Sequence, residues 1–466
     1  MNADRDRSPT RRQALRTGLM GVAAFLGGGG TVYLLTRSRS RAANGAALAP
    51  VAERTSCAVA TASAAPAAPV VEAPAAPAPS RGQPSEFPGD APQGELWELW
   101  QKRGWAREAR YVHASGSSVL CQLCPHECLL EPESRGRCRT RVNKGGKVYT
   151  LAYGNPCSLN VDPIEKKPLY HYLPDARAFS LATAGCQFRC LNCQNWEISQ
   201  RRPEETKDPR GESVRAEAGR RYSRGEFERL SVFPDDVVAL AEGTGCRTIA
   251  YTYSEPNAYF DYMLDTARLA RAKGLKNLSI TCGYIREEPL KELCRYLDAA
   301  NVNLKSFSEK TYRALNAGRL QPILDTLRTL KKHGVHLEVT NLIVPTYTDR
   351  MEEIERMCGW IVETLGPDQV LHFLRFRPLH KLTHLPSTPA QTLADAREIA
   401  RRAGLRYVYV GGAPEIEDAC TTFCPECRKP ILERRYMTLT ARRMNGDRCA
   451  SCDAKIAGVF ETARNG

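Results

Sequence analysis

The alternation of strand-like and helix-like patterns between residues 174 and 415 most constrains the fold. Short runs of β-branched and aromatic residues, each typical of a buried strand, cover 179–183, 248–253, 278–282, 302–307, 336–344, 370–376 and 407–410. Apolar residues at helical spacing fall between these runs, namely Phe260, Met263, Leu264 and Ala267; Leu290, Leu293, Cys294 and Leu297; and Ile354, Met357, Ile361 and Leu365. Strand, helix and strand at this spacing predict parallel βαβ units, and therefore an α/β fold. Six or seven such units form either an open doubly wound sheet or a full or partial barrel, and periodicity does not choose between them.

The ends of the predicted strands carry reactive side chains. The first strand runs into AGCQFRCLNCQNWEIS (184–199), which places Cys186, Cys190 and Cys193 in a CxxxCxxC spacing. The second ends in YTYSEPN (251–257) with Glu255, and the fourth in NLKSF (303–307) with Lys305. Sites in α/β sheets and barrels lie at the carboxyl ends of the strands, so these groups should share one rim. The sixth strand adds His372 and Arg375 as candidates for a pocket wall.

Three thiols in one loop suit an iron–sulfur cluster better than zinc or a disulfide. A structural zinc site is nearly always held by four ligands, and a disulfide needs two. Cubane clusters bind one thiolate per iron, so three cysteines leave one iron open to a substrate or cofactor. The alternatives are a three-cysteine zinc site completed by a distant His, or three buried core thiols, and the shared rim disfavours both.

Several motifs together resemble a known family. CxxxCxxC after the first strand of a β/α array is the signature of radical S-adenosylmethionine (SAM) enzymes. The segments DPIEKKPLYHYLP (162–174), CQNWEISQ (193–200), AYTYSEP (250–256) and RYVYVGG (406–412) look like those of AmmeMemoRadiSam system radical SAM proteins, relatives of pyruvate formate-lyase activating enzymes. The likeness runs from about residue 97 to 460.

This resemblance implies a partial (β/α)6 TIM-like barrel and two cofactors, a [4Fe-4S] cluster and SAM. Cys186, Cys190 and Cys193 would ligate the cluster, whose open iron would chelate the amino and carboxylate groups of SAM. One electron would then cleave SAM to methionine and a 5′-deoxyadenosyl radical. By position, Ser254 and Glu255 would meet the SAM amino group, and Asn303 and Lys305 the ribose or carboxylate.

Two residues depart from the family pattern. The residue before the third cluster cysteine is usually aromatic and lies near adenine, but here it is Asn192. The fourth-strand motif usually begins with aspartate, whereas Asn303 supplies an uncharged amide.

Two further cysteine groups flank the predicted barrel. CPECRKP and CASC supply two CxxC pairs separated by 21 residues, which is near zinc-ribbon spacing, through Cys424, Cys427, Cys449 and Cys452. CQLCPHEC and a later cysteine supply Cys121, Cys124, Cys128 and Cys138. This second group suits either zinc or a second iron–sulfur cluster that would relay electrons, and His126 could replace one thiol. Of the unclustered cysteines, Cys282 lies at a strand end.

The first part of the chain has the composition of a targeting segment and a tether. TRRQAL carries twin arginines, and the uncharged stretch at 17–35 follows it, so 1–41 resembles a twin-arginine export signal or a membrane anchor. Residues 42–93 form an Ala/Pro-rich linker expected to be disordered. The remaining predicted units are an N-terminal Cys-rich module (94–173), the radical SAM core (174–415) and a zinc-ribbon-like module (416–466). We expect a membrane-associated or exported protein, with the cytoplasm as the alternative.

The charge balance does not favour a nucleic-acid partner. The net charge is +14, but the first 41 residues hold eight arginines against two aspartates. The excess of six belongs to the targeting segment, and the rest is spread over a long chain. The leading hypothesis is a radical SAM enzyme whose substrate is unknown, a protein being one candidate. A flavodoxin or ferredoxin would supply its electrons. The alternatives are an exported iron–sulfur electron carrier or metal sensor without SAM chemistry and, less favoured, a zinc-ribbon nucleic-acid binder.

Overall fold

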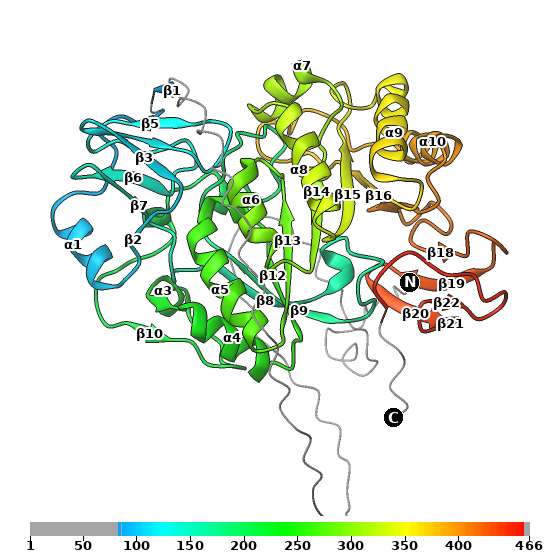
Figure 1. Ribbon diagram of the computed structural model, residues 1–466, viewed down its shortest axis with the longest axis horizontal. Coiled ribbons are helices and arrows are strands. Elements are labelled where there is room, and N and C mark those ends of the chain that lie inside the picture. The colour runs from blue at the N-terminus through cyan, green and yellow to red at the C-terminus, as the bar shows by residue number, and fades with distance from the viewer. Residues whose placement is uncertain (1–82, 85, 461–466) are drawn as a thin grey trace, which may run out of the picture.

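The computed structural model describes residues 83–84 and 86–460. The predicted targeting segment and most of the predicted linker therefore lie outside the described residues. At the centre of the molecule is an eight-stranded sheet, ordered β17-β16-β15-β14-β13-β12-β9-β8 (Figure 1). Its strands are β8 (Ser158–Pro163), β9 (Arg177–Ala182), β12 (Thr248–Tyr251), β13 (Lys276–Thr281), β14 (Ala299–Asn303), β15 (His336–Ile343), β16 (Val370–Arg375) and β17 (Val408–Gly411).

The strand order excludes the doubly wound alternative. From β9 to β17, each strand of the sheet pairs in parallel with the next strand of the sheet along the chain. A doubly wound sheet would have a point where the strand order reverses, and this sheet has none. The two edge strands β8 and β17 do not pair with each other, so the array is an open barrel. Within the described residues it has seven parallel strands, one more than the resemblance implies, and β8 adds an antiparallel edge that the sequence did not predict.

Helices connect the parallel strands, as the apolar periodicity predicted. The longer ones are α4 (Pro234–Gly243), α5 (Phe260–Ala272), α6 (Glu287–Cys294), α8 (Gln321–Lys332), α9 (Met351–Leu365) and α10 (Ala390–Arg402). The shorter elements are α2 (Trp196–Ser199), α3 (Arg224–Glu228), α7 (Glu309–Thr311), the 3-10 turns η1 (Ile164–Lys166), η2 (Pro203–Glu205) and η3 (Pro256–Tyr259), the π-helical turn η4 (Tyr312–Asn316), and the paired strands β10 (Val214–Arg215) and β11 (Leu230–Ser231). Every apolar residue named above for the three predicted helical faces is buried, which confirms those faces.

One predicted strand ends earlier than expected. The pattern at 302–307 was assigned to a strand, but β14 makes its last pair at Asn303 with Thr340. The chain then turns toward α7, because Ser306 Oγ donates a hydrogen bond of 2.7 Å to the Glu353 carboxylate and Ser308 caps the next helix. Lys305 therefore lies in the loop after the strand.

The N-terminal region forms two small sheets beside the barrel. Their strands are β1 (Gln83–Pro84), β5 (Cys128–Leu130), β4 (Ser118–Cys121) and β3 (Val112–Ser115) in one sheet, and β2 (Arg107–Glu108), β7 (Lys147–Thr150) and β6 (Arg141–Lys144) in the other, with α1 (Gly94–Lys102) packed nearby. Ordered packing begins before the predicted boundary at residue 93, since Phe87 pairs with Arg135 and Asp90 forms an ion pair of 3.0 Å with it. The predicted disorder is therefore wrong for this last part of the linker.

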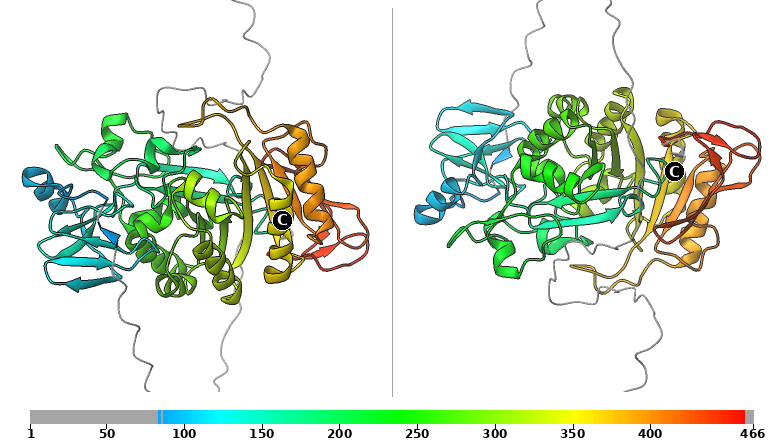
Figure 2. Two further views of the ribbon diagram at one scale, coloured as in Figure 1. Left: turned by 90° about the horizontal axis from the view of Figure 1, so that it is seen from above. Right: turned by 90° about the horizontal axis from the view of Figure 1, so that it is seen from below.

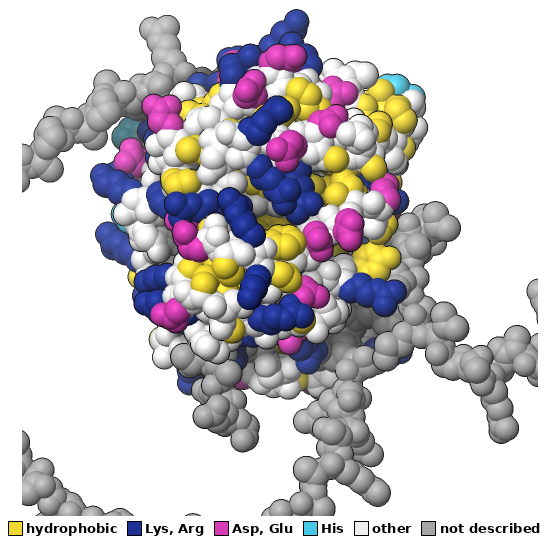
Figure 3. Space-filling view, turned by 90° about the vertical axis from the view of Figure 1, so that its right-hand side faces the viewer, with side chains coloured by type: hydrophobic (Ala, Val, Ile, Leu, Met, Phe, Trp, Pro, Cys, Tyr) yellow, Lys and Arg dark blue, Asp and Glu magenta, His cyan; other side chains and the backbone are white. Residues whose placement is uncertain are grey.

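The C-terminal region is a compact group of short strands at the opposite end of the molecule from the N-terminal sheets (Figure 2). Its strands are β18 (Thr422–Phe423), β19 (Pro430–Arg435), β20 (Thr438–Arg442), β21 (Met444–Asn445) and β22 (Arg448–Cys449). On this side of the molecule, basic side chains are interspersed with acidic and hydrophobic ones (Figure 3). In the described part of the chain, no helix combines the length and apolar character needed to cross a bilayer.

Candidate functional site

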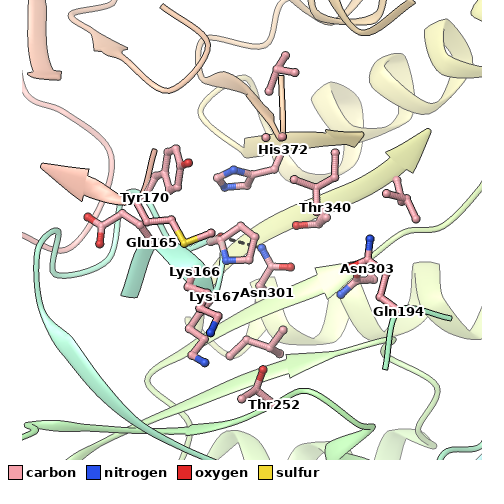
Figure 4. A pocket seen from close by; sticks show the side chains of 18 of the residues that line it. Glu165, Lys166, Lys167, Tyr170, Gln194, Thr252, Asn301, Asn303, Thr340 and His372 are labelled. Carbon is pink, nitrogen blue, oxygen red and sulfur yellow. Dashed lines mark hydrogen bonds between the residues drawn. The ribbon is translucent and has the colours of Figure 1, made fainter. Parts of the chain in front are cut away.

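A cavity of about 1150 Å³ opens at the carboxyl ends of the parallel strands. Alternate residues of neighbouring strands line it, because successive side chains of a strand point to opposite faces. Thr340 and His372 are directly paired in register, as are Asn303 and Thr340, so polar groups from β14, β15 and β16 face one interior volume (Figure 4). A barrel interior with this many polar groups is built to hold a ligand rather than to fill a core.

The three loop cysteines lie in the wall of this cavity. Cys186, Cys190 and Cys193 all line it, and all cysteines of the described residues carry free thiols. The ligands of a single metal ion would all lie within about 4.8 Å of one another. Among the described residues, the three sulfurs do not form such a group. A cubane spreads its thiolates over separate iron atoms and needs this wider spacing. The donor set therefore fits a [4Fe-4S] cluster better than mononuclear zinc.

Hydrogen bonds to sulfur prepare the loop for negative charge. The Phe188 backbone N–H donates to Cys186 Sγ over 3.3 Å, and the Asn316 amide donates to Cys190 Sγ over 3.2 Å. Cys193 Sγ lies 3.0 Å from the Ser199 hydroxyl. Burial raises the pKa of the Cys186 thiol well above its usual value, and a bound metal cation would favour its ionised form.

The loop itself is held by the turn η4. The backbone N–H groups of Arg189 and Leu191 donate to the carbonyl oxygens of Asn316 and Leu315, each over 2.9 Å. Gly318 packs so closely on Phe188 that a Cβ there would lie 2.4 Å from the ring. The end of β9 and the turn η4 together position the cysteines. No local pattern in the sequence indicated that η4 contacts this loop.

Ser254 and Glu255 lie beside the cysteine loop, as predicted. The Ser254 hydroxyl donates to the Thr183 carbonyl oxygen over 2.6 Å. The buried Glu255 carboxylate accepts hydrogen bonds from the Thr281 hydroxyl at 2.5 Å and from the Cys282 backbone N–H at 2.7 Å. Glu255 also begins η3, accepting from the Asn257 backbone N–H at 3.2 Å. It therefore combines a helix-start role with a place in the cavity wall, where Cys282 joins it.

Asn303 and Lys305 also reach the cavity, although Lys305 does so from a loop. The Asn303 amide donates to the Thr281 carbonyl oxygen over 3.3 Å. Burial acts to lower the pKa of Lys305, but the nearby thiols of Cys190 and Cys282 outweigh it and raise that pKa. A cation among these sulfurs matches the excess negative charge of a thiolate-bound cluster.

Unpartnered polar atoms in the cavity wall test whether SAM fits. Asn192 is buried, and its Oδ1 has no hydrogen-bond partner; the same is true of Asn301 Oδ1 and Thr340 Oγ1. Buried polar atoms without partners are costly unless a ligand or water satisfies them. SAM carries amino and hydroxyl donors along its length, so these acceptors suit it. Asn192, which departs from the aromatic pattern, supplies one of them.

The structure adds lining residues that sequence reasoning missed. Lys166 and Lys167 both bind the Asp162 carboxylate, over 2.9 and 2.5 Å, and the Tyr253 hydroxyl also donates to it. Although burial opposes ionisation, these partners lower the pKa of Asp162, while burial lowers the pKa of Lys167 to about 8. The motif DPIEKKPLYHYLP contained these residues, but only the antiparallel strand β8 brings them to the cavity.

The predicted pocket-wall residue His372 is confirmed, and Arg375 is not. His372 lines the cavity and binds the buried Glu338 carboxylate at 2.6 Å. The backbone N–H groups of Tyr170 and His171 donate to the same carboxylate, over 3.0 and 2.8 Å. Arg375 instead points away from the cavity lining and pairs with Glu415 at 2.5 Å, because alternation along β16 puts it on the other face.

The two flanking cysteine groups lie outside this cavity and differ from each other. Cys424, Cys427, Cys449 and Cys452 are the one group of metal-binding side chains in the described residues whose ligand atoms all lie within 4.8 Å. Cys424 Sγ lies 3.5 Å from Cys452 Sγ, and Cys427 Sγ lies 3.7 Å from Cys449 Sγ. This is the compact arrangement that a single tetrahedral ion requires. The other group lies on the opposite side of the molecule from these C-terminal cysteines, next to the cysteine loop. It consists of Cys121, Cys124, Cys128 and Cys138.

Comparison with known proteins gives the site its class. The Radical SAM superfamily profile matches residues 180–361, which contain the cysteine loop and the carboxyl ends of the five strands β9, β12, β13, β14 and β15. An uncharacterized protein of Methanocaldococcus jannaschii is 40% identical over 355 residues, spanning 75% of this chain and 98% of that protein. The pyruvate formate-lyase-activating enzyme of Clostridium pasteurianum is 22% identical over 110 residues, which are 24% of this chain and 46% of that enzyme. Among solved structures, Streptococcus suis SuiB bound to S-adenosylmethionine aligns with a TM-score of 0.36 and 14% identity, over 50% of this chain and 51% of that one.

The chain belongs to the same family as the uncharacterized methanogen protein, and its residues 180–361 form a Radical SAM domain. It is also related to the pyruvate formate-lyase activating enzymes. These similarities support an enzyme of the radical SAM type, with SAM-dependent radical chemistry.

Proposed function

We propose that this protein is a radical SAM enzyme of the AmmeMemoRadiSam type that acts on a protein or peptide partner. Cys186, Cys190 and Cys193 would hold a [4Fe-4S] cluster, with SAM in the cavity beside it. When bound and reduced, the cluster supplies the electron that cleaves SAM to methionine and a 5′-deoxyadenosyl radical. The observation that carries the proposal is the meeting of three free thiols with unpartnered polar atoms in one cavity.

The residues of this chain orient the cofactors and exclude water. Ser254 fixes the end of β12 against the cysteine loop, and Glu255 bridges β12 to β13 through Thr281 and Cys282. Asn192, Asn301 and Thr340 offer unpartnered oxygens to the polar groups of SAM. The inner strand residues keep the site dry, which protects a reactive radical from side reactions.

The shape of the cavity supports a macromolecular substrate. It extends from the cysteine loop to the β19–β20 hairpin, where Tyr436 and Met437 both line it and are 67% and 46% exposed. Exposed apolar groups at the edge of a large cavity are typical of surfaces that bind a partner. A small-molecule substrate would need no such extension of the cavity beyond the barrel.

Anaerobic reconstitution tests the chemistry. The reduced protein should release 5′-deoxyadenosine from SAM, and Cys190→Ala should lose both this activity and the SAM-responsive EPR signal. If the iron–sulfur absorbance is intact and no 5′-deoxyadenosine forms, the chain is an electron carrier instead.

A second experiment tests the substrate class. The protein fraction of a dialysed cell extract should stimulate 5′-deoxyadenosine release, and the small-molecule filtrate should not. The Tyr436→Ala variant should respond less to the protein fraction while keeping its unstimulated rate. Stimulation by the filtrate alone would contradict a macromolecular substrate.

The C-terminal cysteines are proposed to hold zinc in a structural site. We further propose that the segment at 1–41 serves as a targeting sequence, and fusing residues 1–50 to a reporter that works only outside the cytoplasm tests it.

A further inference from the structure

We infer that Cys121, Cys124, Cys128 and Cys138 hold a second iron–sulfur cluster that passes electrons to the cluster at Cys186, Cys190 and Cys193. The site itself stands on the geometry of the N-terminal sheets, whereas its role as a relay rests on the proposed function.

The four thiols converge, but not as ligands of one ion. Electrostatic interactions link Cys124 and Cys128 to each other and to Cys121 and Cys138. Cys121 ends β4 and Cys128 begins β5, so the hairpin brings them together around the turn that carries Cys124. Yet within the described residues no three of these sulfurs lie within 4.8 Å of one another, whereas the C-terminal cysteines all do. This looser spacing fits a polynuclear cluster better than zinc.

Hydrogen-bond donors and positive charge surround the four sulfurs. The Arg141 guanidinium lies 3.4 Å from Cys121 Sγ, and Thr140 Oγ1 lies 3.1 Å from Cys138 Sγ. The backbone N–H groups of His126 and Arg137 donate to the sulfurs of Cys124 and Cys128. Such donors stabilise the anionic cluster and raise its reduction potential. Arg141 is itself fully buried and is fixed by an ion pair of 2.6 Å with Asp261.

His126 connects the two sites instead of acting as a ligand through its Nε2. This nitrogen donates its N–H to the Gln187 carbonyl oxygen over 3.1 Å, so it has no lone pair free to bind a metal. Gln187 lies between Cys186 and Phe188, and its buried side-chain amide has no hydrogen-bond partner on either atom. An unpartnered amide at this position is free to donate to an inorganic sulfide.

The two cysteine groups touch through their backbones. The Cys186 N–H donates to the Cys138 carbonyl oxygen over 3.2 Å. A Cβ on Gly185 would lie 2.6 Å from that oxygen and 2.5 Å from Thr140 Cγ2, so only glycine allows this approach. Cys138 of the N-terminal group and Cys186 of the cysteine loop, each a proposed cluster ligand, are therefore in direct backbone contact. Two clusters attached there are near enough to exchange single electrons.

The proposed relay transfers one electron at a time and needs a named donor. A low-potential donor of the flavodoxin or ferredoxin class is oxidised by one electron as the N-terminal cluster is reduced. That cluster is reoxidised as the electron moves to the cluster in the cavity wall, where the sulfonium of SAM is the final acceptor. A zinc ion could not take part, because zinc has no redox chemistry in proteins.

Metal and sulfide content test the site without any activity measurement. The reconstituted full-length protein should bind twice the iron and sulfide of Cys124→Ala, of Cys138→Ser and of Cys190→Ala. Cys294→Ala is the matched control, because Cys294 is unclustered and, like Cys124, 8% exposed. In Cys190→Ala the remaining EPR signal should not respond to SAM, and in Cys138→Ser it should. If Cys124→Ala and Cys138→Ser keep all the iron and lose zinc, the site is a zinc site and the inference is overturned.

The relay is tested by comparing two reductants. With a flavodoxin-class donor, Cys138→Ser should form 5′-deoxyadenosine at least ten times more slowly than wild type, whereas dithionite should restore most of the rate. The relay would be overturned if Cys138→Ser formed 5′-deoxyadenosine as fast as wild type with both reductants, or were slowed equally with both. If wild type binds both clusters yet never cleaves SAM, the site is supported, while the relay and the proposed function both fail.

Discussion

The hydroxyl of Ser254 donates a hydrogen bond of 2.6 Å to the carbonyl oxygen of Thr183. Thr183 follows β9 and leads into the cysteine loop, and Ser254 follows β12, so this single bond ties the two strand ends that border the proposed SAM site. Both residues are buried, and the bond is therefore shielded from competition with water.

The Ser254→Ala variant should weaken this junction. Loss of the donor leaves the buried Thr183 carbonyl with one partner fewer, at a cost of about 1–2 kcal/mol. We expect a lower unfolding free energy and a five- to thirty-fold weaker SAM affinity, measured by anaerobic denaturation and calorimetry. Ser279→Ala is the control, since that buried hydroxyl on β13 has no partner. Unchanged SAM affinity in Ser254→Ala would show that the tie does not shape the site.

The Asn192→Leu variant should separate stability from binding. It removes a buried oxygen that has no partner, so the SAM-free protein should become more stable by about 1 kcal/mol. Because the same oxygen is proposed to face SAM, the affinity for SAM should fall about tenfold. Equilibrium unfolding with and without SAM measures both effects. The exposed Gln321→Leu change on α8 should alter neither, and a variant that binds SAM normally would remove Asn192 from the site.

The buried pair of Asp162 and Lys167 should behave as a unit. Asp162→Asn leaves a buried ammonium without its counter-charge and should cost about 3–5 kcal/mol of stability. The Asp162→Asn, Lys167→Met double variant should recover much of that loss, because the unpaired charge is gone. A double-mutant cycle in urea measures the coupling. Strictly additive losses would show that the two side chains do not depend on each other.

The Cys452→Ser variant should lose zinc while keeping its iron. Cys452 is the exposed member of the four C-terminal cysteines, and three remaining thiolates bind zinc less tightly. Arg434 of β19 donates to the Tyr170 carbonyl oxygen over 2.7 Å and lines the cavity, so loosening this module should reduce stimulation by a substrate protein. Elemental analysis distinguishes the metals. Cys420→Ser, an unclustered neighbour, should retain zinc, and retention by Cys452→Ser would argue against the four-thiol site.

Acid should destabilise the protein partly through His171. Burial lowers the pKa of His171 to about 4, against about 6.5 in an unfolded chain. Between these values the unfolded state binds more protons, so stability falls as the pH drops from about 6.5 to about 4, by at most about 1.4 kcal/mol per pH unit. The ring Nδ1 and Nε2 lie 2.6 Å from the Ala457 carbonyl oxygen and the Tyr409 hydroxyl. His171→Gln should flatten the pH dependence of the unfolding free energy, and exposed His113→Gln should not; equal slopes would contradict this origin.

The sequence alone determined the elements and the cluster motif, because both are local. Runs of β-branched and aromatic residues located the parallel strands closely, except β14, which the prediction at 302–307 meets only at residues 302–303. Helical spacing gave the buried faces of three helices, and the CxxxCxxC spacing identified the cysteine loop. Position at a strand end correctly brought Glu255, Asn303 and Lys305 to that loop, since parallel strands present their carboxyl ends at one rim.

Tertiary structure decided what depends on contacts between distant segments. The singly wound strand order, the antiparallel β8 and the place of Lys167 follow from how strands pair, which periodicity does not encode. The spacing of four thiols, compact at Cys424, Cys427, Cys449 and Cys452 and wide in the N-terminal group, depends on how separate turns pack. The contact between Cys138 and Cys186 joins residues far apart in the chain, and only the folded molecule brings them together.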